Sequence, residues 1–444
     1  MNHPLPEAFV RRMRARLGRE ADAYFAALDQ PYQRGIRINP RKPFDLSLAE
    51  GLLEEVPWNA PFGHYLTMES AAGADPLHEA GAYYIQEPSA MFPVALLAPQ
   101  PGERVLDLCA APGGKSTQIA DALNGRGLIV CNEPVPGRAK ILSRNVERMG
   151  VANALVVSAD PAQLAPLWPN AFDAVLVDAP CSGEGMFRRH PETRDEWTES
   201  SPEGCAARQR HILSCAVRMV RPGGRLAYST CTLNSEENED MIAWLLSEYP
   251  DFEPVAFSMP IGGECMLDAP DGMAHLYPHR LRGEGHFAAL LRRKGDTQSD
   301  LFAPAAARLS APQKALVNAY EAFAKPFRGF PQPNAQLGDA LLCAPDLPPL
   351  KGVRVLRAGI QLGVLKGKVF APDHALAMAL DADCAIPRVA LTREEALRYQ
   401  SGETLNVPDS LSGYALPVYA GLPLGFGKAS NGKLKNHYPK GLRR

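Results

Sequence analysis

The stretch Val105-Leu106-Asp107-Leu108-Cys109-Ala110-Ala111-Pro112-Gly113-Gly114-Lys115 decides the fold of this 444-residue chain. An apolar run of strand type ends in a turn that contains two glycines, and a helical pattern follows over residues 116–124. A strand that turns into a helix N-terminus in this way is the usual setting of a nucleotide-like cofactor, because backbone N–H groups at the turn point at the ligand. We therefore expect residues 109–115 to bind a cofactor.

Strand-like and helical patterns alternate on both sides of this turn. Apolar runs of strand length occur at residues 104–108, 127–132, 154–158, 173–177, 225–230 and 286–291. Helical patterns separate them at residues 116–124, 137–149, 205–220 and 236–247. Such alternation is typical of a mostly parallel sheet with helices on both faces. The sequence therefore predicts an α/β fold.

Changes in composition divide the chain into four parts. Residues 1–80 begin with a helical pattern from Glu7 to Leu28 and continue as loops rich in Pro and Gly. Residues 81–295 hold the predicted sheet, which ends in a polar, Gly-containing stretch. Residues 296–350 indicate a linker with a short helix near residues 313–323, and the short apolar runs of residues 351–444 predict a small, mostly β module.

Composition excludes several classes of protein. Hydrophobic residues make up 46% of the chain and charged residues 22%, which are ordinary globular values. No run approaches the roughly 20 apolar residues of a membrane span, so we expect a cytoplasmic protein with no membrane partner. The 9 cysteines include no C-x-x-C pair, and Cys205, His211 and Cys215 fall within one helical pattern. We therefore expect neither a disulfide framework nor a metal site.

The charge is balanced overall but not at the ends. The net charge is only −2, whereas residues 1–42 carry nine Lys or Arg against four Asp or Glu. Residues 421–444 carry six Lys or Arg and no acidic residue, and this run also holds Phe426 and Tyr438. Basic runs are often no more than solvated surface, but the two aromatic residues favour contact with a nucleic-acid backbone and its bases.

Two cysteines follow strand-like runs, Cys181 within Asp178-Ala179-Pro180-Cys181-Ser182-Gly183 and Cys231 within Tyr228-Ser229-Thr230-Cys231-Thr232. Ligands of an open parallel sheet bind beyond the carboxyl ends of its strands, so both thiols are expected in the site. Three acidic residues are expected at the same edge. Glu133 would accept hydrogen bonds from the ribose hydroxyls of the cofactor, and Asp160 would accept one from the amine of its adenine ring. Asp178 would lie where the cofactor and the substrate meet.

A thiol pair beside a cofactor loop suits the methylation of cytosine. Carbon C5 of cytosine is a poor nucleophile, and addition of a thiolate to C6 turns the ring into an enamine that attacks an electrophilic methyl group. The second thiol would assist removal of the C5 proton, while Asp178 would bind the N3/N4 edge. A capping box at residues 234–237 predicts a helix N-terminus that favours a thiolate at Cys231, but this reasoning does not decide which thiol attacks.

Two other classes of function remain as alternatives. Gly114-Lys115-Ser116 imitates the end of a phosphate-binding loop, and residues 174–178 imitate the metal-binding strand that accompanies it in NTPases. Cys109 in place of the first glycine argues against that alternative, as does Pro112, which lacks a backbone donor. An RNA-binding assembly factor that retains a cofactor fold would have no need of both thiols.

Three segments together resemble the Sun/nucleolar-protein family of RNA cytosine-5 methyltransferases: residues 107–117, 178–185 and 228–239. The resemblance covers about residues 30–292 and implies a Rossmann-like class I methyltransferase domain that uses S-adenosylmethionine. It implies that Cys231 is the nucleophile and that Cys181 assists product release. The cofactor positions that it implies are Cys109, Ala110, Ala111, Pro112, Gly113, Gly114, Lys115, Glu133, Arg138, Asp160 and Asp178.

The C-terminal part resembles the RsmF-type branch of that family through residues 367–376 and 425–443. This resemblance implies a PUA-like RNA-binding module there and an RNA-binding role for residues 1–80. It also implies a cytosine of small-subunit ribosomal RNA as substrate, flipped out of its stack, in naked RNA or in the assembled subunit. Transfer RNA is the alternative substrate, and no obligate protein partner is expected. The base that removes the C5 proton stays open between Asp178 and a bound water.

Overall fold

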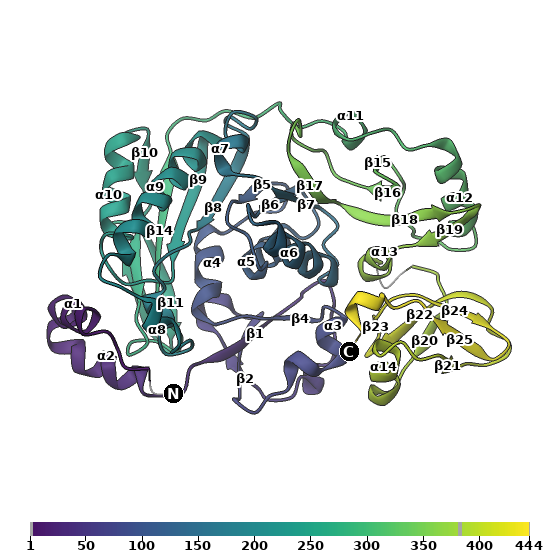
Figure 1. The fold of residues 1–444 in the computed structure, drawn as a ribbon, viewed down its shortest axis with the longest axis horizontal. Coiled ribbons are helices and arrows are strands. Elements are labelled where there is room, and N and C mark those ends of the chain that lie inside the picture. The colour runs from purple at the N-terminus through teal and green to yellow at the C-terminus, as the bar shows by residue number, and fades with distance from the viewer. Residues whose placement is uncertain (1–2, 381–383, 444) are drawn as a thin grey trace.

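The computed structural model describes residues 3–380 and 384–443, so Arg444 of the basic C-terminal run lies outside the described residues. A central sheet has the strand order β10-β14-β9-β8-β5-β6-β7-β17, with β13 paired to β14 (Figure 1). Its strands are β5 Arg104–Asp107, β6 Leu128–Asn132, β7 Ala154–Ser158, β8 Phe172–Asp178, β9 Val220–Thr230, β10 Phe252–Pro254, β13 Met273–Leu276, β14 His286–Arg293 and β17 Arg354–Ala358. The strands from β9 to β7 are parallel, which confirms the predicted mostly parallel sheet.

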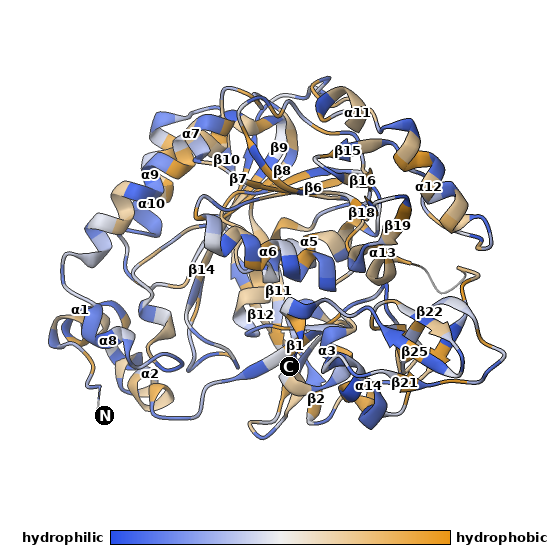
Figure 2. Cartoon of the chain, turned by 45° about the vertical axis from the view of Figure 1, so that its right-hand side comes forward, coloured by the Kyte–Doolittle hydropathy of each residue, from blue (hydrophilic) through white to orange (hydrophobic). Residues whose placement is uncertain are grey.

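Helices cover both faces of this sheet, as predicted. One face packs against α4 Phe92–Leu97, α5 Gly114–Leu123 and α6 Pro136–Arg148. The other face packs against α7 Pro161–Leu164, α9 Ser201–Met219 and α10 Glu239–Glu248. Because both faces are buried, the parallel strands are almost continuously apolar. In Figure 2 the hydrophobic strands lie at the centre of the domain, and the helices around them carry hydrophilic residues on their outer sides.

The predicted N-terminal helix from Glu7 to Leu28 is interrupted. The structure has α1 Glu7–Leu17, a short 3₁₀ turn at Gly18–Glu20 and α2 Ala21–Leu28. Gly18 adopts a φ of 55°, a left-handed conformation that ends α1 and that glycine reaches without steric cost. The apolar residues Phe9, Met13, Tyr24 and Leu28 still form one cluster, so the break reorients the chain without exposing the apolar face.

The prediction of loops between α2 and residue 80 was wrong, because this segment contributes three strands to a four-stranded antiparallel sheet. The sheet has the order β2-β3-β1-β4 and comprises β1 Arg34–Ile38, β2 Leu52–Glu55, β3 Gly63–Leu66 and β4 Tyr83–Ile85; the short helix α3 Pro76–Glu79 precedes β4. Its strands carry residues that normally indicate loops or surface. Arg37 is buried through an ion pair with Asp121, and a Cβ on Gly35 would lie 3.0 Å from neighbouring carbonyl oxygens.

The C-terminal half contains two further sheets. One has the order β15-β16-β18-β19 and the other β20-β22-β24-β25-β21, with β23 paired to β22. Their strands are β15 Ala335–Leu337, β16 Ala340–Cys343, β18 Ile360–Lys366, β19 Val369–Pro372, β20 Arg388–Ala390, β21 Leu405–Asn406, β22 Gly413–Tyr419, β23 Leu422–Pro423, β24 Gly427–Ser430 and β25 Lys433–Asn436. The remaining elements are α8 Thr193–Glu196, α11 Ala305–Arg308, α12 Lys314–Ala324, α13 His374–Ala379, α14 Arg393–Gln400 and the hairpin β11 Phe257–Gly262 with β12 Cys265–Ala269.

Strand β17 differs from expectation because it lies in the segment assigned to the small β module yet pairs antiparallel with β7 at the edge of the central sheet. Its neighbour in sequence, β18, already belongs to the next sheet. The short helix expected near residues 313–323 is present as α12. Edge pairing of this kind satisfies the free backbone groups of β7, an interaction that a local sequence pattern does not encode.

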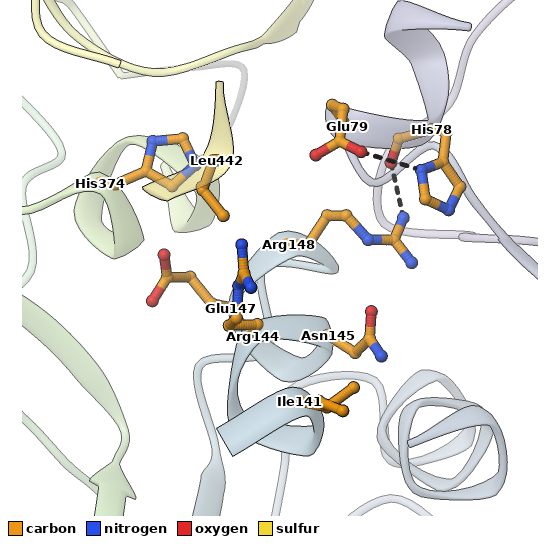
Figure 3. A pocket seen from close by; sticks show the side chains of 9 residues that line it. All are labelled: His78, Glu79, Ile141, Arg144, Asn145, Glu147, Arg148, His374 and Leu442. Atoms are coloured by element: carbon orange, nitrogen blue, oxygen red, sulfur yellow. Dashed lines mark hydrogen bonds and ion pairs between the residues drawn. The ribbon is translucent and has the colours of Figure 1, made fainter. Parts of the chain in front are cut away.

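The parts of the chain meet at a pocket of about 220 Å³ between α3, α6, α13 and the C-terminal end (Figure 3). In it, Arg148 of α6 donates to the carbonyl oxygen of His78 on α3. The N-terminal sheet also shares an apolar core with the C-terminal sheet, where Ile36 and Tyr83 cluster with Tyr399 and Leu405. Within the described ranges, no helix is long and apolar enough to cross a membrane.

Candidate active site

The parallel strands bring the predicted site residues to one edge of the sheet. Across neighbouring strands β9, β8, β5, β6 and β7, the residues at or just after the carboxyl ends are Cys231, Asp178, the loop of residues 109–115, Glu133 and Asp160. We call residues 109–115, Glu133 and Asp160 the cofactor side of this edge. We call Cys181, Cys231 and the segments that bond to their loops the thiol side.

The loop of residues 109–115 forms one wall of a cavity of about 220 Å³. Residues 84–87, Asp107 and Asp178 also line it. Gly113 has a φ of 115°, which allows the chain to turn directly into α5 at Gly114. The cavity therefore lies at a helix N-terminus beyond the end of β5, the position that the sequence predicted for a cofactor.

Asp107 is a fully buried acid that lines this cavity. Its Oδ2 accepts a hydrogen bond of 2.6 Å from Ser116, whereas its Oδ1 has no partner among the described residues. Burial raises the pKa of Asp107 to about 7, because the ionised carboxylate is poorly solvated there. An unpartnered carboxylate oxygen in a cavity suits a cationic group of a ligand.

Glu133 and Asp160 are held by their own local backbone. Glu133 is buried, accepts a hydrogen bond of 2.9 Å from the backbone N–H of Val135 and lies 3.4 Å from Arg138. Arg138 also donates to the carbonyl oxygen of Ala111, so it connects Glu133 to the loop. Asp160 is exposed and caps α7 by accepting from the backbone N–H of Ala162. The structure thus brings Arg138 to the cofactor side together with the two acids.

Asp178 connects the two sides. Its Oδ2 lies 2.8 Å from Nζ of Lys115, and its Oδ1 accepts a hydrogen bond of 2.7 Å from Ser229. Burial disfavours the charged form of Lys115, but Asp178, together with Cys231 and Asp107, outweighs this effect and raises the pKa of the lysine. The sequence pattern singled out Lys115 and Asp178 separately, and the structure pairs them between the cofactor cavity and the thiols.

The two predicted thiols are in contact. Sγ of Cys181 lies 3.2 Å from Sγ of Cys231, and the backbone N–H of Cys231 donates to Sγ of Cys181 at 3.3 Å. The hydrogen bond with Cys231 and burial raise the pKa of Cys181 well above the usual thiol range. Cys181 is therefore protonated at neutral pH, which leaves it suited to transfer a proton rather than to attack as a thiolate.

A buried carboxylate holds the two thiol loops together. Glu237 accepts hydrogen bonds from the backbone and hydroxyl of Ser182, from Gln209 and from Asn234. The predicted capping pair Asn234 and Glu237 forms, but within a turn, and α10 begins only at Glu239. The helix predicted to begin at residue 236 therefore begins later, and its N-terminus does not adjoin Cys231.

Several polar residues at the site were missed by sequence reasoning. Gln86 and Glu87 line the cavity from the N-terminal part of the chain, and Ser229 and His286 flank Asp178 and Cys231. Ser229 lies within the quoted segment of residues 228–232 but was given no role there, and no short motif marks the other three. The sequence does show that Gln86 and Glu87 stand between two apolar runs, a position that is consistent with buried polar side chains. Both side chains are buried in the structure.

Other residues noted in the sequence lie outside the site. Phe426 and Tyr438 are buried in the C-terminal module, so their predicted role in contacting RNA was wrong. Lys428, Lys433 and Lys435 are exposed on the hairpin of β24 and β25. Cys205, His211 and Cys215 lie along α9, and the described residues include no cluster of three or more side chains suited to hold a metal ion.

Family models match almost the whole chain. The model of 16S rRNA methyltransferase RsmB/F matches residues 94–292, and those of the RsmF N-terminal domain, first C-terminal domain and PUA domain match residues 5–88, 323–380 and 387–444. A ribosomal RNA small subunit methyltransferase F from Klebsiella pneumoniae is 34% identical, over 98% of this chain and 96% of its own length. The chain belongs to the RsmF family of methyltransferases.

Other relatives agree with this assignment. The protein of the same name from Erwinia tasmaniensis is also 34% identical, over 98% of this chain and 96% of its own. A methyltransferase homolog protein from Pyrococcus horikoshii has a TM-score of 0.56 and 31% identity, over 65% of this chain and 95% of its own. The structure of NSun6 from Pyrococcus horikoshii with SFG supports the fold alone, with a TM-score of 0.58, 23% identity and coverage of 66% and 100%.

The cofactor is S-adenosylmethionine, and the site residues fit it. The unpartnered Oδ1 of Asp107 suits an ammonium group, the loop at the N-terminus of α5 suits a carboxylate, and Glu133 at the end of β6 suits ribose hydroxyls. The domain organisation of the chain agrees with that of the family. It comprises a Rossmann-like methyltransferase domain, an N-terminal domain and β-rich C-terminal modules that include a PUA domain.

Proposed function

We propose that this chain methylates C5 of a cytosine in small-subunit ribosomal RNA through a covalent adduct between Cys231 and C6. The observation that carries the proposal is the contact of 3.2 Å between Cys181 and Cys231, at the ends of adjacent parallel strands and next to the cofactor cavity. A protein that only bound RNA and cofactor would have no use for two thiols in that place. The names of the relatives and the PUA domain support ribosomal RNA as the substrate.

The roles of the residues follow from their surroundings. S-adenosylmethionine supplies an electrophilic methyl group. Cys231 adds to C6 of the flipped base, which raises the electron density at C5. The carboxylate of Asp178, fixed by Lys115 and Ser229, binds the N3/N4 edge of cytosine and excludes uracil. Cys181, which stays protonated at neutral pH, assists the proton transfers that release the product.

The test uses Cys181→Ala, Cys231→Ala and the double variant, each incubated with small subunits or ribosomal RNA and S-adenosylmethionine. We expect Cys181→Ala to accumulate a protein–RNA adduct on a denaturing gel and the double variant to form none. Mapping of 5-methylcytosine in a deletion strain identifies the RNA. An adduct that persists without Cys231 would overturn the assigned roles, and methylation confined to transfer RNA would overturn the substrate.

A further inference from the structure

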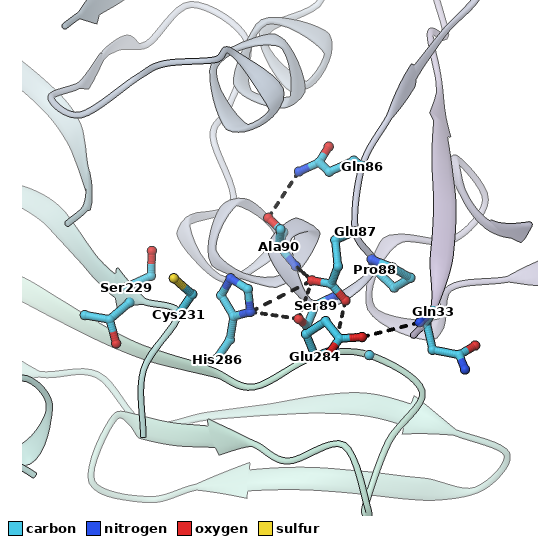
Figure 4. Close-up of polar contacts among 12 residues, drawn as sticks. Gln33, Gln86, Glu87, Pro88, Ser89, Ala90, Ser229, Cys231, Glu284 and His286 are labelled. Atoms are coloured by element: carbon cyan, nitrogen blue, oxygen red, sulfur yellow. Dashed lines mark hydrogen bonds and ion pairs between the residues drawn. The ribbon is translucent and has the colours of Figure 1, made fainter. Parts of the chain in front are cut away.

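A buried polar cluster lies next to Cys231, outside the groups assigned to the methylation reaction. It consists of Glu87 and Ser89, which precede α4, and His286, the first residue of β14 (Figure 4). Ser89 and His286 are almost fully buried, and the hydroxyl of Ser89 lies 2.8 Å from Nδ1 of His286. Burial of three such groups is costly unless each is satisfied, so the hydrogen-bond pattern determines what the cluster can do.

The pattern fixes the proton positions. The carboxylate of Glu87 accepts four hydrogen bonds, from the backbone N–H groups of Ser89, Ala90 and Glu284 and from the hydroxyl of Ser89. The single hydroxyl proton of Ser89 is therefore directed to Glu87. The oxygen of Ser89 must then accept its hydrogen bond from Nδ1–H of His286. This assignment leaves Nε2 of His286 without a proton and with a free lone pair.

The free lone pair lies on the side of the thiols. Phe287 is paired in register with Thr230, so His286 is opposite Cys231, one position beyond the end of β9. Cross-strand neighbours in an antiparallel pair project from the same face. Figure 4 shows the imidazole between Cys231 and the Glu87–Ser89 pair. Among the described residues, Cys231 included, none forms a hydrogen bond with Nε2 of His286, and the polar contacts of this histidine all involve Nδ1.

Burial keeps the imidazole of His286 neutral at neutral pH. The charged groups that act on His286 are Glu87, Lys115 of α5 and Asp178 of β8. Burial lowers the pKa of His286 to about 4, and this effect outweighs the opposing influence of Glu87. The lone pair of Nε2 is therefore available throughout the neutral range, and Glu87 can stabilise, through Ser89, a positive charge that appears on the ring during reaction.

We propose that Nε2 of His286 accepts the thiol proton of Cys231 as the sulfur adds to the substrate, an inference that rests on the proposed role of Cys231 as nucleophile. The S–H bond breaks as the Nε2–H bond forms, and the sulfur electron pair forms the bond to C6. The C5=C6 electron pair moves toward C5. At product release, the S–C6 bond breaks, its electron pair returns to sulfur, and the sulfur recovers its proton from Nε2. The C5–H bond breaks at this stage: its proton passes to Asp178 or to a bound water, and its electron pair restores the C5=C6 bond as the S–C6 bond breaks.

The test measures the alkylation of Cys231 by iodoacetamide as a function of pH, in the full-length protein without RNA and with the labelled peptide quantified by mass spectrometry. The wild-type rate should be nearly independent of pH between about 5.5 and 8. In His286→Phe, the rate should follow the thiolate fraction of an unassisted thiol, whose pKa is about 8.5, and should therefore rise about tenfold per pH unit. At pH 7 this rate should be roughly 30-fold or more below the rate of the fully ionised thiol at high pH.

Two further variants separate a base from a positioning residue. His286→Gln retains a donor toward Ser89 but has no basic nitrogen, so it should behave like His286→Phe. It also provides the measurement if His286→Phe does not fold. The matched control is His374→Phe, a buried histidine of α13 whose pKa is likewise lowered to about 4 by burial. Its profile should match that of the wild type.

The outcomes distinguish the two proposals. A wild-type rate that itself rises tenfold per pH unit, or a flat profile in His286→Gln, would overturn the role of His286. Methylation of RNA by His286→Phe should also fall by about 10²- to 10⁴-fold at pH 7, the usual contribution of general base catalysis. If the wild type shows the flat profile but forms no 5-methylcytosine in ribosomal RNA, the pairing of His286 with Cys231 stands and the proposed substrate fails.

Discussion

On the cofactor side of the sheet edge, Glu133 and Asp160 are held by their own neighbours in sequence, whereas on the thiol side the contacts that bring the two thiols together join distant segments. Glu133 and Asp160 each accept from a backbone N–H two residues further on. Cys181 and Cys231 are 50 residues apart in sequence, and Ser89 and His286 are 197 apart. The comparison shows that the cofactor side can form as soon as each strand ends, but that the thiol side requires the completed sheet.

The largest expected effect tests the long-range support of the thiol side. Arg188 follows the Cys181 loop and is buried against Glu284, which precedes His286 by two residues. Arg188→Met should lower the free energy of unfolding by about 3 to 5 kcal/mol, because Glu284 would remain buried without its partner. Chemical denaturation measures this loss.

The matched control for that variant is Arg280→Met, which removes an exposed arginine paired with Glu20. Exposed pairs contribute about 0 to 1 kcal/mol, so its stability should stay close to that of the wild type. Equal losses in the two variants would mean that the thiol side does not depend on its buried ion pair.

The second prediction tests whether the cofactor side affects the binding of S-adenosylmethionine without affecting the rate of methyl transfer. Glu133→Ala should weaken the binding of S-adenosylmethionine about 10- to 100-fold, since two charge-assisted hydrogen bonds are lost. Methylation at saturating cofactor should change little, because the thiol side is untouched. Titration calorimetry and single-turnover assays measure the two quantities. A large loss at saturating cofactor would show that the two sides are not independent.

The third prediction concerns pH. The pKa of Asp107 is raised to about 7, so below that pH its carboxyl group is protonated and cannot attract an ammonium group. The affinity for S-adenosylmethionine should therefore fall by up to about tenfold per pH unit below pH 7. Since the folded pKa exceeds the unfolded value of about 3.9, this group makes the protein less stable as pH rises from about 4 to 7. Asp107→Asn should remove both dependences, and an unchanged affinity profile would contradict the assignment.

The smallest expected effect tests a purely local contact. Asp160→Ala removes the N-cap of the short helix α7, at an exposed position. Its cost should be about 1 kcal/mol in unfolding free energy, the usual value of a lost cap. Thermal unfolding measures it, with Asp240→Ala on α10 as an acidic control whose side chain caps no helix. A loss comparable to that of Arg188→Met would remove the contrast between the two sides.

The parallel strands β5 to β9 of the α/β domain could be predicted because each is an apolar run that is recognisable in the local sequence, whereas the short antiparallel strands β10 and β13 were missed. The apolar runs ending at Asp107, Asn132 and Ser158 are buried on both faces, so they are recognisable without knowledge of their neighbours. The N-terminal sheet is not recognisable in this way. Arg37 lies within β1 and is buried because Asp121 of α5 neutralises it and Gln86 and Thr117 accept its hydrogen bonds, and a local pattern cannot contain that information.

The sequence by itself determined the cofactor turn, the alternation of strands and helices from β5 to β9, and the residue types at those strand ends, because these follow from backbone preferences and from short-range hydrogen bonds. Only the tertiary structure decided that Cys181 contacts Cys231, that Lys115 pairs with Asp178, and that His286 faces Cys231. Those relations depend on strand register and on the packing of the N-terminal segment against the sheet. Both are set by contacts between residues that lie far apart in the chain.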